Sequence, residues 1–272
     1  MITFPNAKIN LGLNIVSKRD DGYHNLETIF YPIAIKDAVE VIISEDGKDS
    51  LTESGITVDT LPENNLVMKA VQAMRKHYNI PPISIHLLKK IPFGAGIGGG
   101  SADASFMLKL LNEKFNLRAS KQELASIACQ LGADCPFFIY NKPLFASGIG
   151  EIFENVDIDL KKYYFVLVKP NIHVSTKEAF AMVKPRQPQL SLKEIITKDL
   201  DQWKHLMHND FEDSIFPQYP EIESIKHQLY NLGAIYSSMS GSGSSVYGIF
   251  EKEADLENQF PTDYYIWQGE GM

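Results

Sequence analysis

The chain has 272 residues, of which 44% are hydrophobic and 22% charged. This composition is typical of a globular protein and allows one large domain or two of moderate size. The formal net charge is −8. Nucleic-acid-binding proteins usually carry a basic surface, so we expect no nucleic acid as a partner.

The first half of the chain combines strands with helices. Alternating apolar residues predict strands over 7–15, 27–35, 38–44 and 83–90. The polar segment 17–27 contains a glycine and is interpreted as a hairpin or loop. Apolar residues at helical spacing predict a helix over 64–77, with Asn64 or Asn65 as its N-cap.

A glycine-rich loop follows Pro92 and leads into a long amphipathic helix. A second helix is expected over 120–132. Ser120 and Glu123 have the spacing of a capping box at its start, and Gly132 is the expected stop at its end.

The second half continues the mixture of elements. We expect a buried strand over 163–170, a surface loop over 184–193 and a helix over 221–233 that ends at Gly233. Residues 234–250 predict a strand, a tight turn rich in glycine and serine, and another strand. Strands and helices without a strict β-α-β rhythm favour an α+β fold.

Two lobes are the expected arrangement for a chain of this length, an N-terminal lobe over 1–155 and a C-terminal lobe over 156–272. No apolar run reaches the ~18 residues of a membrane-spanning helix, and the N-terminus does not resemble a signal peptide. We therefore expect a cytoplasmic protein with no membrane partner. Cys129 and Cys135 lack a second pair at zinc spacing and are expected to be reduced.

The strongest local feature is the run of five glycines within 94–100. Glycine has no Cβ, so backbone N–H groups can approach a ligand closely. The helix that follows adds the positive end of its dipole. The sequence therefore predicts a phosphate-binding loop made of Pro92, Gly94, Gly96, Gly98, Gly99, Gly100 and Ser101.

Two common phosphate-binding motifs fit this loop poorly. Gly94, Gly96 and Gly99 satisfy the dinucleotide fingerprint, but ~90 residues precede the loop, and two predicted helices follow it instead of a second strand. A Walker loop is also excluded, because no lysine precedes Ser101 at the end of the glycine run.

The segment from Pro92 to Ala102 resembles the central ATP-binding motif of the GHMP kinases, the family of galactokinase, homoserine kinase, mevalonate kinase and phosphomevalonate kinase. Residues 5–11 resemble the N-terminal motif of that family, and 240–245 resemble its C-terminal glycine motif. The resemblance implies a two-lobe α+β fold with the active site in the interlobe cleft. It also implies ATP with Mg²⁺ and a small-molecule acceptor.

Two further segments are similar to one branch of this family, the kinases that phosphorylate a cytidine-diphosphate-linked methylerythritol in the non-mevalonate isoprenoid pathway. They are 19–28, with one residue inserted before Asp21, and 131–138, where Cys135 replaces the usual valine. The resemblance implies transfer of the γ-phosphate of ATP to a hydroxyl of this substrate, which gives a 2-phosphate and ADP.

The catalytic residues implied by the resemblance are Asp134 and Lys8. Asp134 would act as the general base that takes the proton of the attacking hydroxyl. Lys8 would keep that carboxylate ionised and contact the transferring phosphoryl group. Ser101 is the side chain that we expect nearest the metal ion.

A second set of residues is expected to bind the two substrates. Tyr23 would stack on the cytosine, with Phe180 on the opposite face, and His24 would read its edge. The full expected substrate-binding set is Asn10, Tyr23, His24, Asp134, Thr176, Phe180, Ser240 and Gly241. Asn65 and Lys89 are candidates for the surroundings of the ATP base.

Two other functions remain open at this point. One is another kinase of the family, acting on mevalonate or homoserine, which the segment from Gly22 to His24 disfavours. The other is a non-catalytic nucleotide-binding protein on the same fold, which Lys8 and Asp134 disfavour. Either a monomer or a homodimer is expected.

Overall fold

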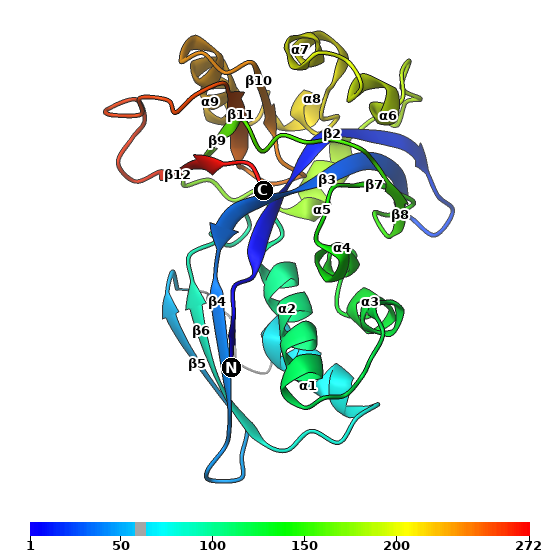
Figure 1. Cartoon of the computed structure of the whole chain (residues 1–272). Coiled ribbons are helices and arrows are strands. Elements are labelled where there is room, and N and C mark those ends of the chain that lie inside the picture. The colour runs from blue at the N-terminus through cyan, green and yellow to red at the C-terminus, as the bar shows by residue number, and fades with distance from the viewer. Residues whose placement is uncertain (58–63) are drawn as a thin grey trace. The chain divides into compact units, whose positions relative to one another are not determined.

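The structure is a computed structural model, and it describes residues 1–57 and 64–272. The chain forms two compact units, each built from segments that are far apart in the sequence (Figure 1). Unit 1 comprises Met1–Ala7, Ile35–Phe93 and Gly98–Lys142, and unit 2 comprises Lys8–Ala34, Gly94–Ile97 and Pro143–Met272. These units differ from lobes cut at 155/156, because strands β2 (Asn6–Lys18) and β3 (His24–Lys36) each contribute to both. The cut at 155/156 stays a prediction.

Unit 1 contains a four-stranded sheet in the order β1-β4-β6-β5 among the residues that the structure describes. Its strands are β1 (Ile2–Thr3), β4 (Ala38–Ile43), β5 (Ser50–Gly55) and β6 (Ile83–Lys89). β4 is antiparallel to β1 and β6, whereas β5 runs parallel to β6.

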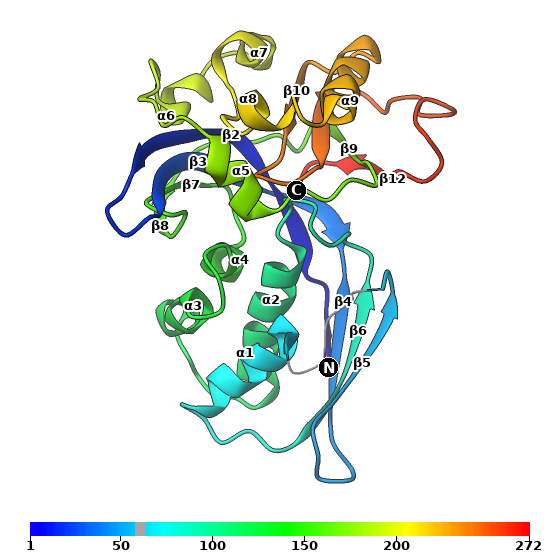
Figure 2. The same ribbon diagram turned by 180° about the vertical axis from the view of Figure 1, so that it is seen from behind.

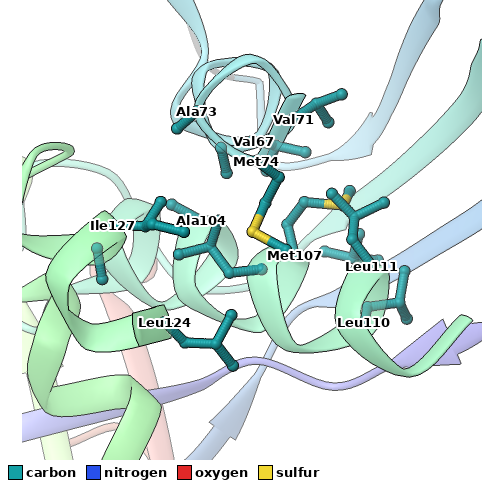
Figure 3. Packing of buried hydrophobic residues seen from close by; sticks show 14 of the residues in the cluster. Val67, Val71, Ala73, Met74, Ala104, Met107, Leu110, Leu111, Leu124 and Ile127 are labelled. Carbon is teal, nitrogen blue, oxygen red and sulfur yellow. The ribbon is translucent and has the colours of Figure 1, made fainter. Parts of the chain in front are cut away.

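Helices cover one face of this sheet, as Figure 2 shows for α1 and α2. The helices of unit 1 are α1 (Leu66–Arg75), α2 (Gly99–Lys114), α3 (Lys121–Cys129) and α4 (Cys135–Tyr140). Figure 3 shows Val67 and Met74 of α1 directed toward Ala104 and Met107 of α2. This is the packing expected of an amphipathic helix whose apolar side chains recur every three or four residues.

Helix α2 is the central helix of unit 1. Its residues 102–108 are all buried, and it packs against α1, α3, α4 and the sheet. A helix that is covered on every side is held by its neighbours along its length. The first turn of α2, which follows the glycine loop, is therefore fixed within unit 1.

Unit 2 contains two four-stranded sheets among the described residues, in the orders β2-β3-β7-β8 and β10-β11-β9-β12. The remaining strands are β7 (Leu144–Ser147), β8 (Ile152–Asn155), β9 (Tyr164–Lys169), β10 (Tyr236–Met239), β11 (Val246–Phe250) and β12 (Tyr265–Glu270). The second sheet is antiparallel throughout.

Helices of unit 2 pack against its second sheet, with α9 against β10 and β11. The helices of unit 2 are α5 (Thr176–Met182), α6 (Leu192–Ile195), the 3₁₀ helix η2 (Leu200–Gln202), α7 (Trp203–Leu206), α8 (Glu212–Ile215) and α9 (Pro220–Asn231). Within the described parts of the chain, no helix is long and apolar enough to span a membrane.

Most of the expected helix ends are confirmed. Asn65 caps α1, since its side chain accepts a hydrogen bond from the N–H of Val67 at 2.9 Å. The capping box of Ser120 and Glu123 is present at the start of α3. The stop at Gly132 is wrong: α3 ends at Cys129, three residues before this glycine.

Candidate active site

Lys8 is buried in β2 and held by contacts within unit 2. Its Nζ donates hydrogen bonds to Oδ1 of Asn10 at 2.7 Å and to the carbonyl oxygen of Gly96 at 3.2 Å. Its backbone N–H donates to the carbonyl oxygen of Ile97 at 3.0 Å. Because lysine is rarely buried without polar partners, these contacts explain its place in an apolar strand. A solvent-facing lysine is excluded here.

The C-terminal glycine motif packs on the first half of the central glycine loop. Ser240 Oγ donates to the carbonyl oxygen of Gly96 at 3.0 Å. A Cβ added at Gly96 would lie 2.1 Å from the carbonyl oxygen of Ser240, and one added at Gly243 would lie 2.4 Å from the nitrogen of Gly96. Both glycines are therefore required by close contact between two backbones, a reason that the sequence motif alone does not reveal.

Buried polar residues of unit 2 form hydrogen bonds around β2 and the C-terminal glycine motif. Asn10 Nδ2 donates to Thr28 Oγ1 at 2.9 Å, and Thr28 Oγ1 donates to the carbonyl oxygen of Gly12 at 2.6 Å. Asn209 Nδ2 donates to the carbonyl oxygen of Gly241 at 2.9 Å. Sequence reasoning missed Thr28 and Asn209 as site residues. Thr28 lies inside the similar segment 19–28, a signal that could have found it, whereas Asn209 lies in no motif.

The second half of the glycine loop starts helix α2 in unit 1. Gly98 occupies the N-cap position with a φ of +73°, a left-handed conformation that favours glycine, and it offers no side-chain cap. In the same unit, Asn65 and Ser120 cap α1 and α3 with their side chains. The first N–H groups of α2 thus lack a side-chain cap and carry the positive end of the dipole, which suits a phosphate.

The predicted loop residues are divided between the two units. Gly94 and Gly96 belong to unit 2, whereas Pro92, Gly98, Gly99, Gly100 and Ser101 belong to unit 1.

Asp134 occupies the N-cap position of α4 in unit 1. Its backbone is αR and its side chain makes no capping hydrogen bond to α4, so a purely structural role as a helix cap does not account for the residue. The next residue, Cys135, is fully buried. Burial raises the pKa of its thiol to about 11, so it is a neutral thiol near pH 7.

Lys89 lies in a buried ion cluster of unit 1 with Asp37 and Asp103. The exposed fractions of these three residues are 5%, 1% and 2%. Lys89 Nζ contacts Asp37 Oδ2 and lies 2.6 Å from Asp103 Oδ2. Burial opposes the charge of Lys89, but the carboxylates of Asp103 and Asp37 outweigh it and raise the pKa of the lysine.

The two carboxylates of this cluster differ in their surroundings. Asp37 Oδ1 accepts hydrogen bonds from the backbone N–H groups of Lys90 and Ile91 at 2.5 and 2.8 Å. Asp103 Oδ1 is buried without a hydrogen-bond partner among the described residues. Burial raises the pKa of the Asp103 carboxyl to about 7, although the Lys89 charge opposes this. The ammonium of Lys89 is thus engaged inside unit 1, and its proposed role at the ATP base stays a prediction.

The aromatic residues expected to bind the base lie in unit 2. The ring of His24 stacks on that of Phe180, with centroids 5.2 Å apart and planes inclined by 25°. Tyr23 is 61% exposed. Burial, with a smaller effect of Lys18, lowers the pKa of His24, so its ring is neutral near pH 7. The structure therefore brings His24 and Phe180 together, whereas we expected cytosine on Phe180.

The two remaining candidates are side chains at helix starts. Asn65 Nδ2 donates to Glu53 Oε1 at 2.7 Å, so both ends of this amide are engaged in unit 1. Thr176 is the first residue of α5, and its Oγ1 lies 3.4 Å from Ser242 Oγ in the C-terminal glycine motif.

Known protein families match two stretches of this chain. The sequence model of the "GHMP kinases N terminal domain" matches residues 65–142, and that of the "GHMP kinases C terminal" domain matches residues 191–261. Together they cover more than half of the chain. The chain belongs to the GHMP kinase family.

Several relatives match nearly the whole GHMP kinase chain. A protein of Parabacteroides distasonis is 57% identical over 271 residues, 99% of each chain, and one of Bacteroides fragilis is 60% identical over 94% of each. Both are named 4-diphosphocytidyl-2-C-methyl-D-erythritol kinase. A crystal structure titled 4-(cytidine 5'-diphospho)-2C-methyl-D-erythritol kinase has a TM-score of 0.78 at 29% identity and covers 92% of this chain and 90% of its own.

The expected α+β fold of the family is therefore confirmed, and the chain is a kinase. Membership of the family makes ATP the phosphoryl donor and a small molecule the acceptor.

A carboxylate-rich group elsewhere in the kinase does not suggest a second metal site. His208, Asp210 and Asp213 of unit 2 offer ligand atoms within 4.8 Å of one another. However, Arg186 lies 2.8 Å from Asp210 and 3.3 Å from Asp213. The guanidinium already compensates both carboxylates, so we assign no metal to this group.

The Lys89→Met variant is expected to destabilise the kinase by about 3–5 kcal/mol, because it leaves two buried carboxylates without their cation. Urea unfolding at pH 7 measures the change. Lys90→Met is the matched control, since Lys90 is exposed and adjacent. Its free energy of unfolding should change by no more than about 0.5 kcal/mol. Equal stability of the two variants would mean that the ion cluster does not stabilise the fold.

Proposed function

We propose that this kinase transfers the γ-phosphoryl group of ATP to a hydroxyl of 4-diphosphocytidyl-2-C-methyl-D-erythritol, giving the 2-phosphate and ADP in the non-mevalonate isoprenoid pathway. The observation that carries the proposal is 57% identity, over 99% of both chains, to a protein with that name. The loop from Gly22 to His24, with His24 on Phe180, supports it because it places aromatic rings where a base could bind.

In the proposed mechanism, Asp134 accepts the proton of the substrate hydroxyl as its oxygen bonds to the γ-phosphorus. The bond from that phosphorus to the bridging oxygen of ADP breaks. Lys8 supplies positive charge to the transferring group, and the N–H groups of the glycine loop and of the first turn of α2 hold the phosphates. Catalysis then rests on positioning and charge compensation.

We also propose Mg²⁺ as the metal ion of the reaction. Magnesium is commonly held by one or two protein groups together with substrate phosphates and water. The hydroxyl of Ser101, in the first turn of α2, fits this limited donor set. When bound, the ion would neutralise charge on the phosphates.

We propose that the cytosine ring, on binding, replaces the imidazole ring of His24 on the face of Phe180. Because His24 occupies a face of Phe180, a base between Tyr23 and Phe180 would take the place of the imidazole. The displaced neutral ring then has one donor and one acceptor for the base edge. Stacking is similar for cytosine and uracil, so discrimination falls to His24 and nearby backbone groups.

A panel of acceptors tests the proposed substrate, with ADP release as the measurement. The kinase should consume ATP with the cytidine diphosphate substrate and not with mevalonate or homoserine. Turnover with mevalonate or homoserine alone would place the chain in another branch of the family. ATP binding without turnover on any acceptor would favour a non-catalytic nucleotide-binding protein.

Two variants test the roles of the aromatic loop. Tyr23→Ala should weaken the cytidine substrate and its uridine analogue about equally, since base stacking is worth ~1–3 kcal/mol for any base. His24→Ala should weaken mainly the cytidine substrate. Values of kcat/KM for both substrates measure the difference, and ATP affinity serves as the control. Equal losses with His24→Ala would remove this residue from edge recognition.

Three further expectations stay predictions: a monomer or homodimer, the cytoplasmic location, and the contacts of Asn10, Thr176, Ser240 and Gly241 with substrate.

A further inference from the structure

Two side chains of α2 bond to the backbone of α4 inside unit 1. Ser105 Oγ donates a hydrogen bond to the carbonyl oxygen of Cys135 at 2.7 Å. Lys109 Nζ donates to the carbonyl oxygen of Phe138 at 3.0 Å. Residues four apart lie on the same face of a helix, so Ser105 and Lys109 form one continuous contact along α4. We call these two hydrogen bonds the α2–α4 seam.

The seam meets α4 at both of its ends. Cys135 is the first residue of α4 and directly follows Asp134, while Phe138 lies in the last turn. The last carbonyl groups of a helix have no partner within it. Lys109 therefore supplies a donor and a positive charge where the helix dipole is negative.

The seam also connects to the first turn of α2. Ser105 Oγ lies 2.8 Å from the carbonyl oxygen of Ser101 as well as 2.7 Å from that of Cys135. Ser105 is fully buried. One hydroxyl thus lies between the start of the phosphate-binding helix and the residue that follows Asp134.

The ammonium group of Lys109 is directed toward protein atoms rather than into water. Lysine side chains usually extend their charge into water, but Nζ of Lys109 lies 3.4 Å from the centroid of the Phe106 ring and bonds to Phe138. Burial, with a smaller effect of Lys121, lowers the pKa of Lys109 to about 8. The lysine still carries its charge near pH 7.

Helix α4 depends on tertiary contacts for its position, and it packs against both α2 and α3. It has only six residues, and helices much shorter than ~12 residues are marginal without tertiary packing. Asp134 adds no cap to it. Because Asp134 is the N-cap residue of α4, its backbone takes its position from the contacts that hold this helix.

We propose that Ser105 and Lys109 are positioning residues for Asp134, which fix the general base relative to the first turn of α2. This inference rests on the proposed function only in assigning Asp134 as the base. Misplacement of a catalytic group by ~1 Å can cost ~10²-fold in rate, so loss of one bond of the seam should slow turnover while the phosphate cradle stays intact.

The first test compares two lysines of α2. Lys109→Met keeps the stem on Phe106 and removes the donor. We expect kcat to fall about tenfold with unchanged ATP affinity. Lys114→Met is the matched control: Lys114 also lies near an aromatic ring, at 5.8 Å from Phe115, and its side chain donates no hydrogen bond within residues 1–57 and 64–272. It should leave kcat unchanged.

A double-mutant cycle separates positioning from general stability. Lys109→Met should lower kcat in the wild-type background and have no further effect in the Asp134→Asn background. Ser105→Ala, a second variant, should behave in the same way. An equal loss of kcat in the wild-type and Asp134→Asn backgrounds would overturn the proposal. So would a loss of ATP affinity as large as the loss of kcat.

Hydrogen exchange provides a readout that does not depend on the acceptor. Amides of α4 should exchange faster in Lys109→Met than in Lys114→Met, whereas those of α3 should not change. Unchanged exchange in α4 would overturn the proposal even if the kinase were active. Absence of turnover in the wild-type protein would instead count against the proposed function, and the exchange result would still decide the seam.

Discussion

The Asp134→Asn variant is expected to lose ~10²–10⁴ in kcat, which is the usual contribution of a general base. An amide cannot take the proton of the attacking hydroxyl. Because Asp134 makes no capping bond to α4, the substitution should leave the helix in place. ADP release under saturating ATP and acceptor measures kcat, and calorimetry measures ATP affinity, which should change little.

Glu113→Gln is the matched control for this variant. Glu113 is an exposed carboxylate on α2 in the same unit, so the same loss of charge there should leave kcat unchanged. Turnover of Asp134→Asn at the wild-type rate would show that the hydroxyl loses its proton by another route.

Lys8→Met is expected to lower kcat by ~10²–10³, the usual cost of losing one group that stabilises charge in a transition state. The methionine keeps the apolar stem within β2. It removes the donor to Asn10 Oδ1, whereas the carbonyl oxygen of Gly96 keeps its bond from Ser240. A buried acceptor left without a donor costs ~1–3 kcal/mol, so the protein should still fold.

Lys36→Met serves as the control, because Lys36 is exposed at the end of β3. Steady-state kinetics and urea unfolding should be measured on both variants. If Lys8→Met retained full activity, the buried ammonium would have a structural role only. Loss of folding in Lys8→Met alone would show that its bonds to Asn10 and Gly96 matter more for stability than proposed.

Elements with a strong local pattern were predictable from the sequence. Strand β6 and the capped helices α1 and α3 carry their periodicity and their caps within a few residues. Strands β5, β8 and β12 were missed because few of their side chains are buried. Without buried alternate residues, a strand has no pattern that separates it from a loop.

The long-range contacts of the candidate site could not be predicted. Asp37, Lys89 and Asp103 are far apart in the chain and meet only because the sheet of unit 1 packs beside α2. The close approach of Gly96 to Gly243 is likewise a tertiary contact. Local patterns identify which residues are unusual, such as the buried Lys8, whereas their partners depend on the fold.

The interleaving of the two units has a consequence for how the protein is made. Unit 2 takes β2 and β3 from the start of the chain and pairs β3 with β7, which begins at Leu144. A ribosome releases β2 and β3 long before β7 emerges. During that time the edge of β3 that later pairs with β7 is unpaired, which favours aggregation. Nascent chains stopped before residue 143 should therefore need chaperones more than the complete protein.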